Sequence, residues 1–292
     1  MQRLWKRELL LATGIVAGCT TSSSAPEATA DPTTQQDDAS APHPSPGASS
    51  SEAGDATVTA PTKLQCLARW YGGAPELVAG AWHLALPGGQ KVLFDDGKVK
   101  TFDEAVDAPD LEDTLSIPYS VGPIVPIANV NLDPGRIRSD AFFKAVFGDS
   151  SDAIEAQLVD VTFIGQTVRF HPRAAAALAK VSTRLSDAIA TDASLAPFVT
   201  GTLGGTFTWR VILNTNRLSG HSFGFAIDIN VSKSNYWEWD NPSAGIVWKN
   251  QVPKAIVDAF EAEGFIWGGR WYHYDTMHFE YRPEMFDPQC RT

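Results

Sequence analysis

Residues 219–230 read SGHSFGFAIDIN and carry the most informative pattern of this 292-residue chain. From residue 225 onward, large apolar side chains alternate with other residues, which places Asp228 in the middle of an expected strand, 225–230. A carboxylate at such a position is costly unless it is paired or binds a metal ion. His221 lies seven residues earlier, an odd separation that would put it on the opposite face of a flat strand. Gly224 permits a bend that brings His221 and Asp228 together.

Residues 267–281, WGGRWYHYDTMHFEY, form a second pattern near the end of the sequence. Asp275 and His278 are three residues apart across an expected turn into a strand, 278–281. With His221 and Asp228, His278 completes a set of two histidines and one aspartate, which suits Zn²⁺ and leaves a fourth position open for water. Asp275 would then stand beside that water and take its proton. Either histidine alone is more often a hydrogen-bonded core residue, so the prediction depends on the whole set.

The two patterns together resemble the M15 peptidases. The resemblance rests on Ser-x-His-x-x-Gly-x-Ala-x-Asp, followed by Gly-Gly-x-Trp and Asp-x-x-His, and it is strong from about Leu203 to Tyr281 and weak back to Asp140. These are zinc peptidases of the D-alanyl-D-alanine carboxypeptidase and L-alanyl-D-glutamate endopeptidase types, which cut bacterial peptidoglycan stem peptides. The resemblance implies that His221, Asp228 and His278 bind zinc and that Asp275 is the general base. Asp-x-x-His, rather than Glu-x-x-His, is typical of the endopeptidase branch but does not settle which bond is cut.

Further site residues follow from the same resemblance. Family members place an arginine on a preceding strand, where it polarises the substrate carbonyl, and Arg210 is the best match, with Arg217 as the alternative. Arg210 lies closer to His221 than in phage-type members, and it is also compatible with pairing to a surface acid. Other polar residues near the motifs have two readings each: Ser219 and Asn230 orient the ligands or end a turn or strand, Glu280 supports His278, and His273 contacts substrate or is solvated.

The expected fold is α+β, with a mostly antiparallel central sheet flanked by helices, as in D-Ala-D-Ala carboxypeptidases and Hedgehog-like domains, and a small β-rich N-terminal preamble. Residues 62–135 are expected to form this extension, and residues 136–292 the zinc peptidase domain. Helices are expected at Asp140–Phe147, from Pro172, and from Pro253 to Gly264. A hairpin is expected at 158–170, and further strands at Trp82–Leu86, Lys91–Phe94, Thr206–Leu213 and 265–267.

The N-terminus predicts export. Residues 1–19 combine basic residues, a short apolar run and Val16-Ala17-Gly18-Cys19, which resembles a lipobox and implies cleavage before Cys19 and its acylation. A plain secretory signal or an uncleaved anchor is the alternative. Residues 20–61 are rich in Ser, Thr, Ala and Pro and are expected to form a disordered tether. The protein would thus be located in the bacterial cell envelope and would contact a membrane only through the lipid on its N-terminus.

The composition of the chain narrows the classes of function that it can have. The formal net charge of −11 argues against a nucleic-acid partner. Of the three cysteines, Cys66 and Cys290 remain as a pair in an oxidising compartment and are expected to form a disulfide, with two free thiols as the alternative.

The favoured function is zinc-dependent hydrolysis of stem peptides. The alternative is a catalytically weak, peptidoglycan-binding lipoprotein that retains the peptidase fold. The oligomeric state is left open.

Overall fold

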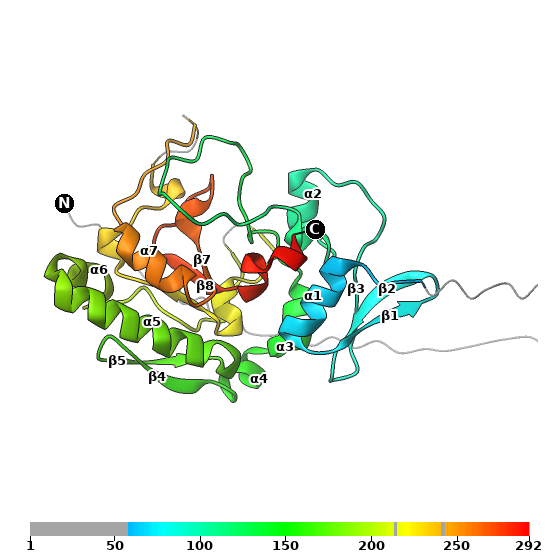
Figure 1. Ribbon diagram of the computed structural model, residues 1–292. Coiled ribbons are helices and arrows are strands. Elements are labelled where there is room, and N and C mark those ends of the chain that lie inside the picture. Colours follow the sequence, from blue (N-terminus) through cyan, green and yellow to red (C-terminus); the bar gives the residue numbers. More distant parts are fainter. Residues whose placement is uncertain (1–57, 213–214, 241–242, 244, 292) are drawn as a thin grey trace, which may run out of the picture. The chain divides into compact units, whose positions relative to one another are not determined.

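The computed structural model describes residues 58–212, 215–240, 243 and 245–291. Residues Ala56–Thr292 form one compact unit. The expected signal segment with Cys19, and the tether up to residue 57, lie outside the described residues. The α+β class is confirmed: small antiparallel sheets are combined with several helices (Figure 1). Within the described part of the chain, no helix is both long and apolar enough to cross a membrane.

The N-terminal extension contains a helix and a small sheet. Helix α1 (Thr62–Tyr71) is followed by strands β1 (Ala74–Val78), β2 (Ala81–Ala85) and β3 (Lys91–Leu93), which pair antiparallel in that order. Helix α2 (Phe102–Asp107) and the 3-10 turn η1 (Asp113–Leu115) come next. The two strands expected here are confirmed, whereas α1 was not expected. Helix α1 packs on β1 and β2 and on the C-terminal turn η9 (Pro288–Cys290).

The expected disulfide is present in the structure. Cys66 of α1 is bonded to Cys290 of η9, with their Cα atoms 5.3 Å apart and a separation of 224 positions in the sequence. Both cysteines are buried in the main hydrophobic core. The bond therefore joins the beginning and the end of the described region, and α1 belongs to the same core as the rest of that region.

The middle of the chain forms a helix and hairpin layer. Helices α3 (Asp140–Phe147) and α4 (Ser151–Glu155) lead into the antiparallel hairpin of β4 (Val159–Phe163) and β5 (Gln166–Phe170). Helix α5 (Pro172–Thr191) lies along this hairpin (Figure 1). It begins where expected, because Pro172 occupies its first position and His171 Nδ1 accepts the N–H of Arg173. The short elements η2 (Ala193–Leu195) and α6 (Ala196–Val199) follow.

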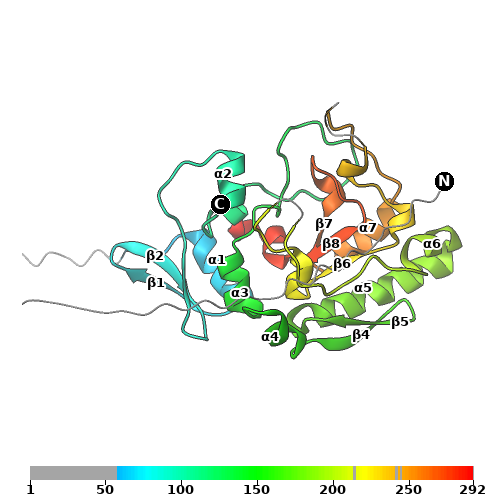
Figure 2. The same ribbon diagram turned by 180° about the vertical axis from the view of Figure 1, so that it is seen from behind.

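A three-stranded sheet positions the two sequence patterns. Strands β6 (Ala226–Asp228), β7 (Phe265–Trp267) and β8 (His278–Tyr281) are antiparallel in the order β6-β8-β7. Helix α7 (Lys254–Glu261) packs between α5 and β7 (Figure 2). The register pairs Asp228 directly with His278. Residues that are 50 positions apart in the sequence are thus neighbours on one face of the sheet.

Two expected strands differ from the structure. The expected strand Thr206–Leu213 is wrong: its described residues, up to Ile212, form one isolated bridge, Val211 with Leu218, and the preceding Gly205 forms another with Asp228. The backbone there bonds to a turn instead of a strand, because the Arg210 N–H donates to Ser222 Oγ and the Thr208 N–H to the His221 carbonyl. The strand expected at 225–230 shortens to Ala226–Asp228, since Asn230 caps the 3-10 turn η4 (Val231–Lys233).

Aromatic packing fixes the base of the site. The rings of Phe223 and Phe225, on either side of Gly224, stack with centroids 5.8 Å apart. Phe143 of α3 contacts both rings, at 5.5 and 5.2 Å, and all three side chains are fully buried. Aromatic pairs of this kind add about 0.5–1.5 kcal/mol beyond area burial. Phe143 of α3 therefore stabilises the bend between His221 and Asp228 through these ring contacts.

Candidate metal centre and active site

His221 reaches Asp228 because the chain turns sharply at Gly224. His221 lies on the 3-10 turn η3 (Gly220–Phe223), and the Oγ of Ser219 accepts the His221 N–H at 3.4 Å. Gly224 has a φ of +68°, in the left-handed region that favours glycine. A Cβ added there would also lie 2.6 Å from Cδ2 of Leu158. The bend expected at Gly224 is present, and Ser219 supports it by capping the turn.

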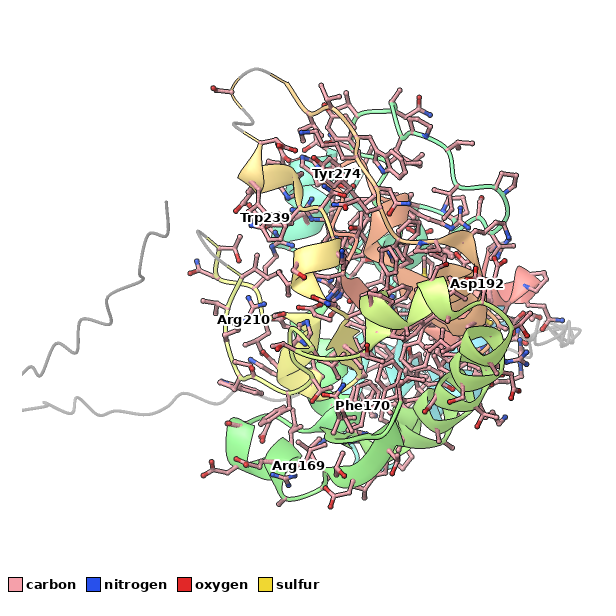
Figure 3. All side chains as sticks on the ribbon, turned by 90° about the vertical axis from the view of Figure 1, so that its left-hand side faces the viewer. Arg169, Phe170, Asp192, Arg210, Trp239 and Tyr274 are labelled. Carbon is pink, nitrogen blue, oxygen red and sulfur yellow. A yellow bond between two sulfur atoms is a disulfide. The ribbon has the colours of Figure 1, made fainter. Side chains whose placement is uncertain are left out.

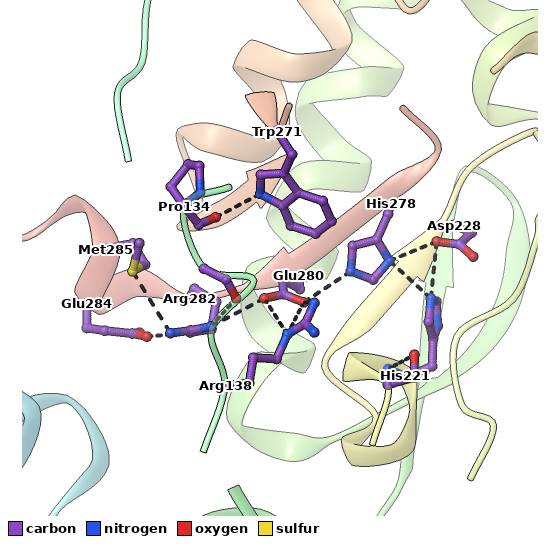
Figure 4. A network of polar contacts seen from close by, with 12 residues as sticks. Pro134, Arg138, His221, Asp228, Trp271, His278, Glu280, Arg282, Glu284 and Met285 are labelled. Carbon is purple, nitrogen blue, oxygen red and sulfur yellow. Dashed lines mark hydrogen bonds and ion pairs between the residues drawn. The ribbon is translucent and has the colours of Figure 1, made fainter. Parts of the chain in front are cut away.

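Three side chains from different elements converge on one point (Figure 4). Nε2 of His221 and Nδ1 of His278 lie 3.1 Å each from Oδ1 of Asp228, and 3.2 Å from one another. Burial alone raises the pKa of Asp228, but the two adjacent histidines outweigh it and hold the pKa well below its ordinary value. The three predicted ligands are thus brought together, with a carboxylate that stays ionised.

Hydrogen bonds on the outer side of each histidine fix its tautomer. Nδ1 of His221 lies 2.8 Å from the carbonyl oxygen of Thr206, which can only accept, so this nitrogen carries a proton. Nε2 of His278 lies 3.1 Å from Oε2 of Glu280 and likewise donates. The inward nitrogens, Nε2 of His221 and Nδ1 of His278, are therefore the ones that face Asp228 and each other, and once deprotonated they offer their lone pairs to a cation placed between them. The Thr206 carbonyl was not identified from the sequence, since a backbone group leaves no residue signature.

Glu280 connects His278 to a buried ionic network (Figure 4). Arg138 donates to both Glu280 oxygens at 2.9–3.2 Å, and Arg282 donates at 3.3 Å. Glu280 is fully buried. Burial alone raises its pKa, but Arg138, His278 and Arg282 outweigh it and hold the pKa of Glu280 well below the usual range. Glu280 supports His278 as expected, whereas its partner Arg138, in the segment before α3, was not identified from the sequence.

Asp275 is a partly buried residue whose carboxylate has free hydrogen-bonding capacity. Its backbone is held by two bonds, from its N–H to the Gly268 carbonyl and from the His278 N–H to its own carbonyl. Its Oδ1 atom has no hydrogen-bond partner among the described residues. Burial and the nearby charge of Asp228 raise the pKa of Asp275 to about 6, against the opposing charges of His278 and His221. A carboxylate in this state can take up a proton near neutral pH.

One small cavity of about 90 Å³ joins these groups. His221, Asp228, Asp275 and His278 line it, together with Arg210, whose guanidinium is exposed and whose backbone is bonded to η3. Figure 3 shows Arg210 on the segment that leads into this turn. The remaining lining residues include Arg136, Arg138, Tyr236, Trp237, Trp271 and His273. Arg136 was not identified from the sequence, because it precedes Asp140 and so lies outside the segment in which the motifs resemble the family.

Asn230 and Arg217, which were considered as site residues, do not line this cavity. Asn230 bonds to the Pro197 carbonyl and to Ser232, and none of the bonds described for it reaches the three converging side chains. Arg217 is half-buried, and its Nε has no hydrogen-bond partner in the described part of the chain. Burial, and the charges of Arg138 and Arg136, lower the pKa of Arg217 to about 10. Of the two arginines considered, Arg210 is the one that lines the cavity.

Two imidazoles and a carboxylate around one point, beside a second carboxylate in a shared cavity, define a candidate metal-hydrolase centre. Residues 213–281, about a quarter of the chain, match the sequence model of the D-alanyl-D-alanine carboxypeptidase family. This segment, which contains His221, Asp228, Asp275 and His278, is thereby identified as part of an M15 peptidase, as its motifs predicted. No curated protein and no solved structure matches the chain.

Proposed function

We propose that this protein is a zinc-dependent peptidase that hydrolyses peptide bonds in bacterial peptidoglycan stem peptides. The observation that carries the proposal is the convergence of His221, Asp228 and His278 beside Asp275, whose Oδ1 has no hydrogen-bond partner among the described residues. The match to the D-alanyl-D-alanine carboxypeptidase family supports the reaction class, a peptidase of that kind.

The ligand atoms are spaced as zinc requires. A tetrahedral zinc ion with bonds of roughly 2.0–2.1 Å separates its ligand atoms by ~3.3 Å. The three separations here are 3.1, 3.1 and 3.2 Å. Two imidazoles and one carboxylate also suit zinc better than magnesium or calcium, which prefer all-oxygen sites. A small outward shift of these side chains accommodates the ion.

In the proposed reaction, the zinc ion and the side chains around it each have a separate role. Bound zinc supplies Lewis acidity, which lowers the pKa of water and polarises a carbonyl group. Asp275, which has a free carboxylate oxygen, accepts the proton of the attacking water and passes it to the leaving amine. Arg210 lines the same cavity and places a permanent positive charge where the carbonyl oxygen becomes negative. Glu280 holds His278 in the tautomer that presents Nδ1 to the ion.

We further propose that the protein is an exported lipoprotein of the cell envelope, held to the membrane by lipid on Cys19. The lipobox-like residues 16–19 and the polar segment that follows them support this location. A peptidase on such a tether would reach the cell wall, where its proposed substrate is found. Retention of Cys19 as a lipidated N-terminus in the mature protein, measured by mass spectrometry, tests the anchor.

Digestion of purified muropeptides tests the activity. The domain of residues 58–292, with its disulfide formed, is loaded with one equivalent of zinc and incubated with muropeptides, and the products are identified by mass spectrometry. We expect cleavage of a stem-peptide bond that stops on chelation and returns with zinc. Stoichiometric zinc binding without cleavage of any stem peptide would instead support the alternative, a peptidoglycan-binding protein that retains the peptidase fold.

A further inference from the structure

A buried carboxylate next to the catalytic cavity holds an arginine and a histidine that the proposed chemistry does not use. Asp133 is fully buried. Its Oδ1 accepts the backbone N–H of His273 at 3.0 Å, and its Oδ2 lies 2.5 Å from Nδ1 of His273 and 3.4 Å from an amino nitrogen of Arg136. Burial raises the pKa of Asp133, but the bond from His273 and the charge of Arg136 outweigh it and lower the pKa. Asp133 is therefore an anion shared by His273 and Arg136.

The His273 ring is locked in position. Its centroid lies 4.8 Å from that of Trp237 and 5.0 Å from that of Tyr272, both edge to face, and 6.5 Å from that of Phe102, stacked. Because Nδ1 is bonded to Asp133, Nε2 is the nitrogen left for another partner. Arg136 is positioned by the same surroundings, with its guanidinium carbon 5.9 Å from the Trp237 ring centroid. Both side chains line the cavity that contains Asp275.

The guanidinium of Arg136 has donors left for an anion in this part of the cavity. Arg138 is held by Glu280 at 2.9 Å, whereas the contact described between Arg136 and Asp133 engages one guanidinium nitrogen at 3.4 Å. The chain carries a formal net charge of −11, so cations gathered at one cavity are not a reflection of composition. Arg136 also lies near enough to Asp275 for its charge to lower the pKa of that carboxyl.

Arg136 and His273 belong to the wall that carries Asp275, whereas Arg210 belongs to the wall built on η3. His273 and Asp275 are two residues apart, and Trp237 follows Tyr236, which is bridged to Asp275. In the proposed reaction Asp275 delivers a proton to the leaving amine, so the residue that carries this amine lies on the Asp275 side. The scissile carbonyl lies towards Arg210.

We propose that Arg136 and His273 form a subsite for the free α-carboxylate of the substrate residue that supplies the leaving amine. This inference rests on the proposed peptidase function and adds the chemical feature by which the substrate is recognised. Both bond types suggested by the family share that feature. In a terminal D-Ala-D-Ala the last residue carries the α-carboxylate, and in L-Ala-D-Glu the D-glutamate carries one when its γ-carboxyl continues the chain. Arg136 would pair with the carboxylate, and Nε2 of His273 would donate to it when the imidazole takes up a second proton, since Nδ1 already donates to Asp133.

Two pairs of peptides test the subsite with the zinc-loaded domain. One pair ends in D-Ala-D-Ala as the free acid or the carboxamide, and the other contains L-Ala-γ-D-Glu with its α-carboxyl free or amidated. For the pair that the protein cleaves, we expect the acid to be preferred. Arg136→Gln and His273→Asn should lower kcat/KM for the acid roughly 10- to 100-fold and change it less than about 3-fold for the amide. The asparagine amide can still donate to Asp133, so this variant removes Nε2 while keeping the anchor.

Controls separate this inference from the proposed function. Arg169→Gln removes the same charge from the exposed hairpin arginine that pairs with Glu155, and it should leave both rates unchanged. Equal cleavage of acid and amide by the unmodified protein, or equal losses on both in the variants, would overturn the subsite. Binding of the same peptides to the metal-free domain, measured by calorimetry, gives a second readout. Preference for the acid there, lost in both variants, would support the subsite even if no peptide were cleaved and the peptidase proposal failed.

Discussion

Nε2 of His278 lies 3.1 Å from Oε2 of Glu280, two residues further along strand β8. Alternate residues of a strand share a face, so the strand itself places the carboxylate behind the imidazole. Glu280 in turn pairs with Arg138 and Arg282, both of which are buried. The orientation of one metal-site histidine therefore depends on ion pairs that are also part of the core.

Glu280→Gln should weaken both metal binding and folding. The glutamine keeps the shape of the side chain but removes the charge that Arg138 and Arg282 share, and loss of one partner from a buried ionic network costs about 3–5 kcal/mol. Loss of the carboxylate behind a histidine ligand lowers metal affinity by about 10- to 100-fold. Denaturant unfolding of the metal-free protein and competition with a chelator measure the two effects. The control is Glu155→Gln, in the exposed pair with Arg169, which should cost less than about 1 kcal/mol. Unchanged zinc affinity in Glu280→Gln would contradict this role.

Metal binding should release a proton from His278. Burial alone lowers the pKa of His278, but its hydrogen bonds to Asp228 and Glu280 outweigh it and raise the pKa to about 10 in the metal-free protein. The proton on Nδ1 then occupies the place of the metal ion. Between pH 7 and 9, about one proton should therefore leave His278 per zinc bound, and the affinity should rise about tenfold per pH unit. Calorimetry in buffers of different ionisation enthalpy measures the release, and zero release across this range would exclude a protonated His278.

The same pKa shift predicts the pH dependence of stability without metal. A raised pKa means that the folded state binds the His278 proton more tightly than the unfolded state does. This contribution is fully present below the unfolded value of about 6.5 and is lost as the pH rises through about 10. The metal-free protein should lose stability over that window, and saturating zinc should flatten the dependence. Thermal unfolding at a series of pH values, with and without zinc, distinguishes the two curves.

Reduction of the Cys66–Cys290 bond should destabilise the domain strongly. The bond closes a loop of about 225 residues, for which the chain-entropy relation gives about 5 kcal/mol as an upper value. The double variant Cys66→Ser/Cys290→Ser removes the cross-link without leaving a thiol. Its free energy of unfolding should fall by about 2–5 kcal/mol, while zinc binding to the folded fraction persists. Identical unfolding curves for oxidised and reduced protein would show that the bond does not form in solution.

Local rules together with the family resemblance were sufficient to predict that His221, Asp228 and His278 come together. Strand alternation, one glycine bend and the spacing of Asp275 and His278 place four side chains with little need for the remainder of the fold. The strand predicted at Thr206–Leu213 was wrong because the apolar pattern there resembles that of a strand. The backbone instead bonds to a turn, and the pattern does not encode where that turn lies. Arg136 and Arg138 could not be found, since they reach the site from more than 130 residues before His273 and Glu280.

Asp275→Asn and Asp228→Asn should separate the general base from the metal ligand. In Asp275→Asn the side chain keeps its shape but can no longer accept a proton from water. Zinc should still bind near stoichiometrically, and turnover should drop by about 10²- to 10⁴-fold. In Asp228→Asn the site loses the anion that both histidines face, so zinc occupancy should fall together with the rate. Metal analysis after dialysis and single-turnover kinetics on the same preparations give the comparison.

Asp275 also has a purely structural interpretation, in which it only supports the turn before His278. Its backbone bonds to Gly268 and His278 would survive the change to asparagine, because they involve no side-chain atom. A structural role therefore predicts a stability change of no more than about 1 kcal/mol and no specific change in rate. The pH dependence of the rate gives a further test of the general base. Burial and the charge of Asp228 raise the pKa of Asp275 to about 6 without metal, so Asp275 keeps its proton in mildly acidic solution. Bound zinc adds positive charge and lowers that pKa, so the loss of activity on acidification should begin at or below pH 6. Near-normal turnover by a folded, zinc-loaded Asp275→Asn protein would exclude Asp275 as the base.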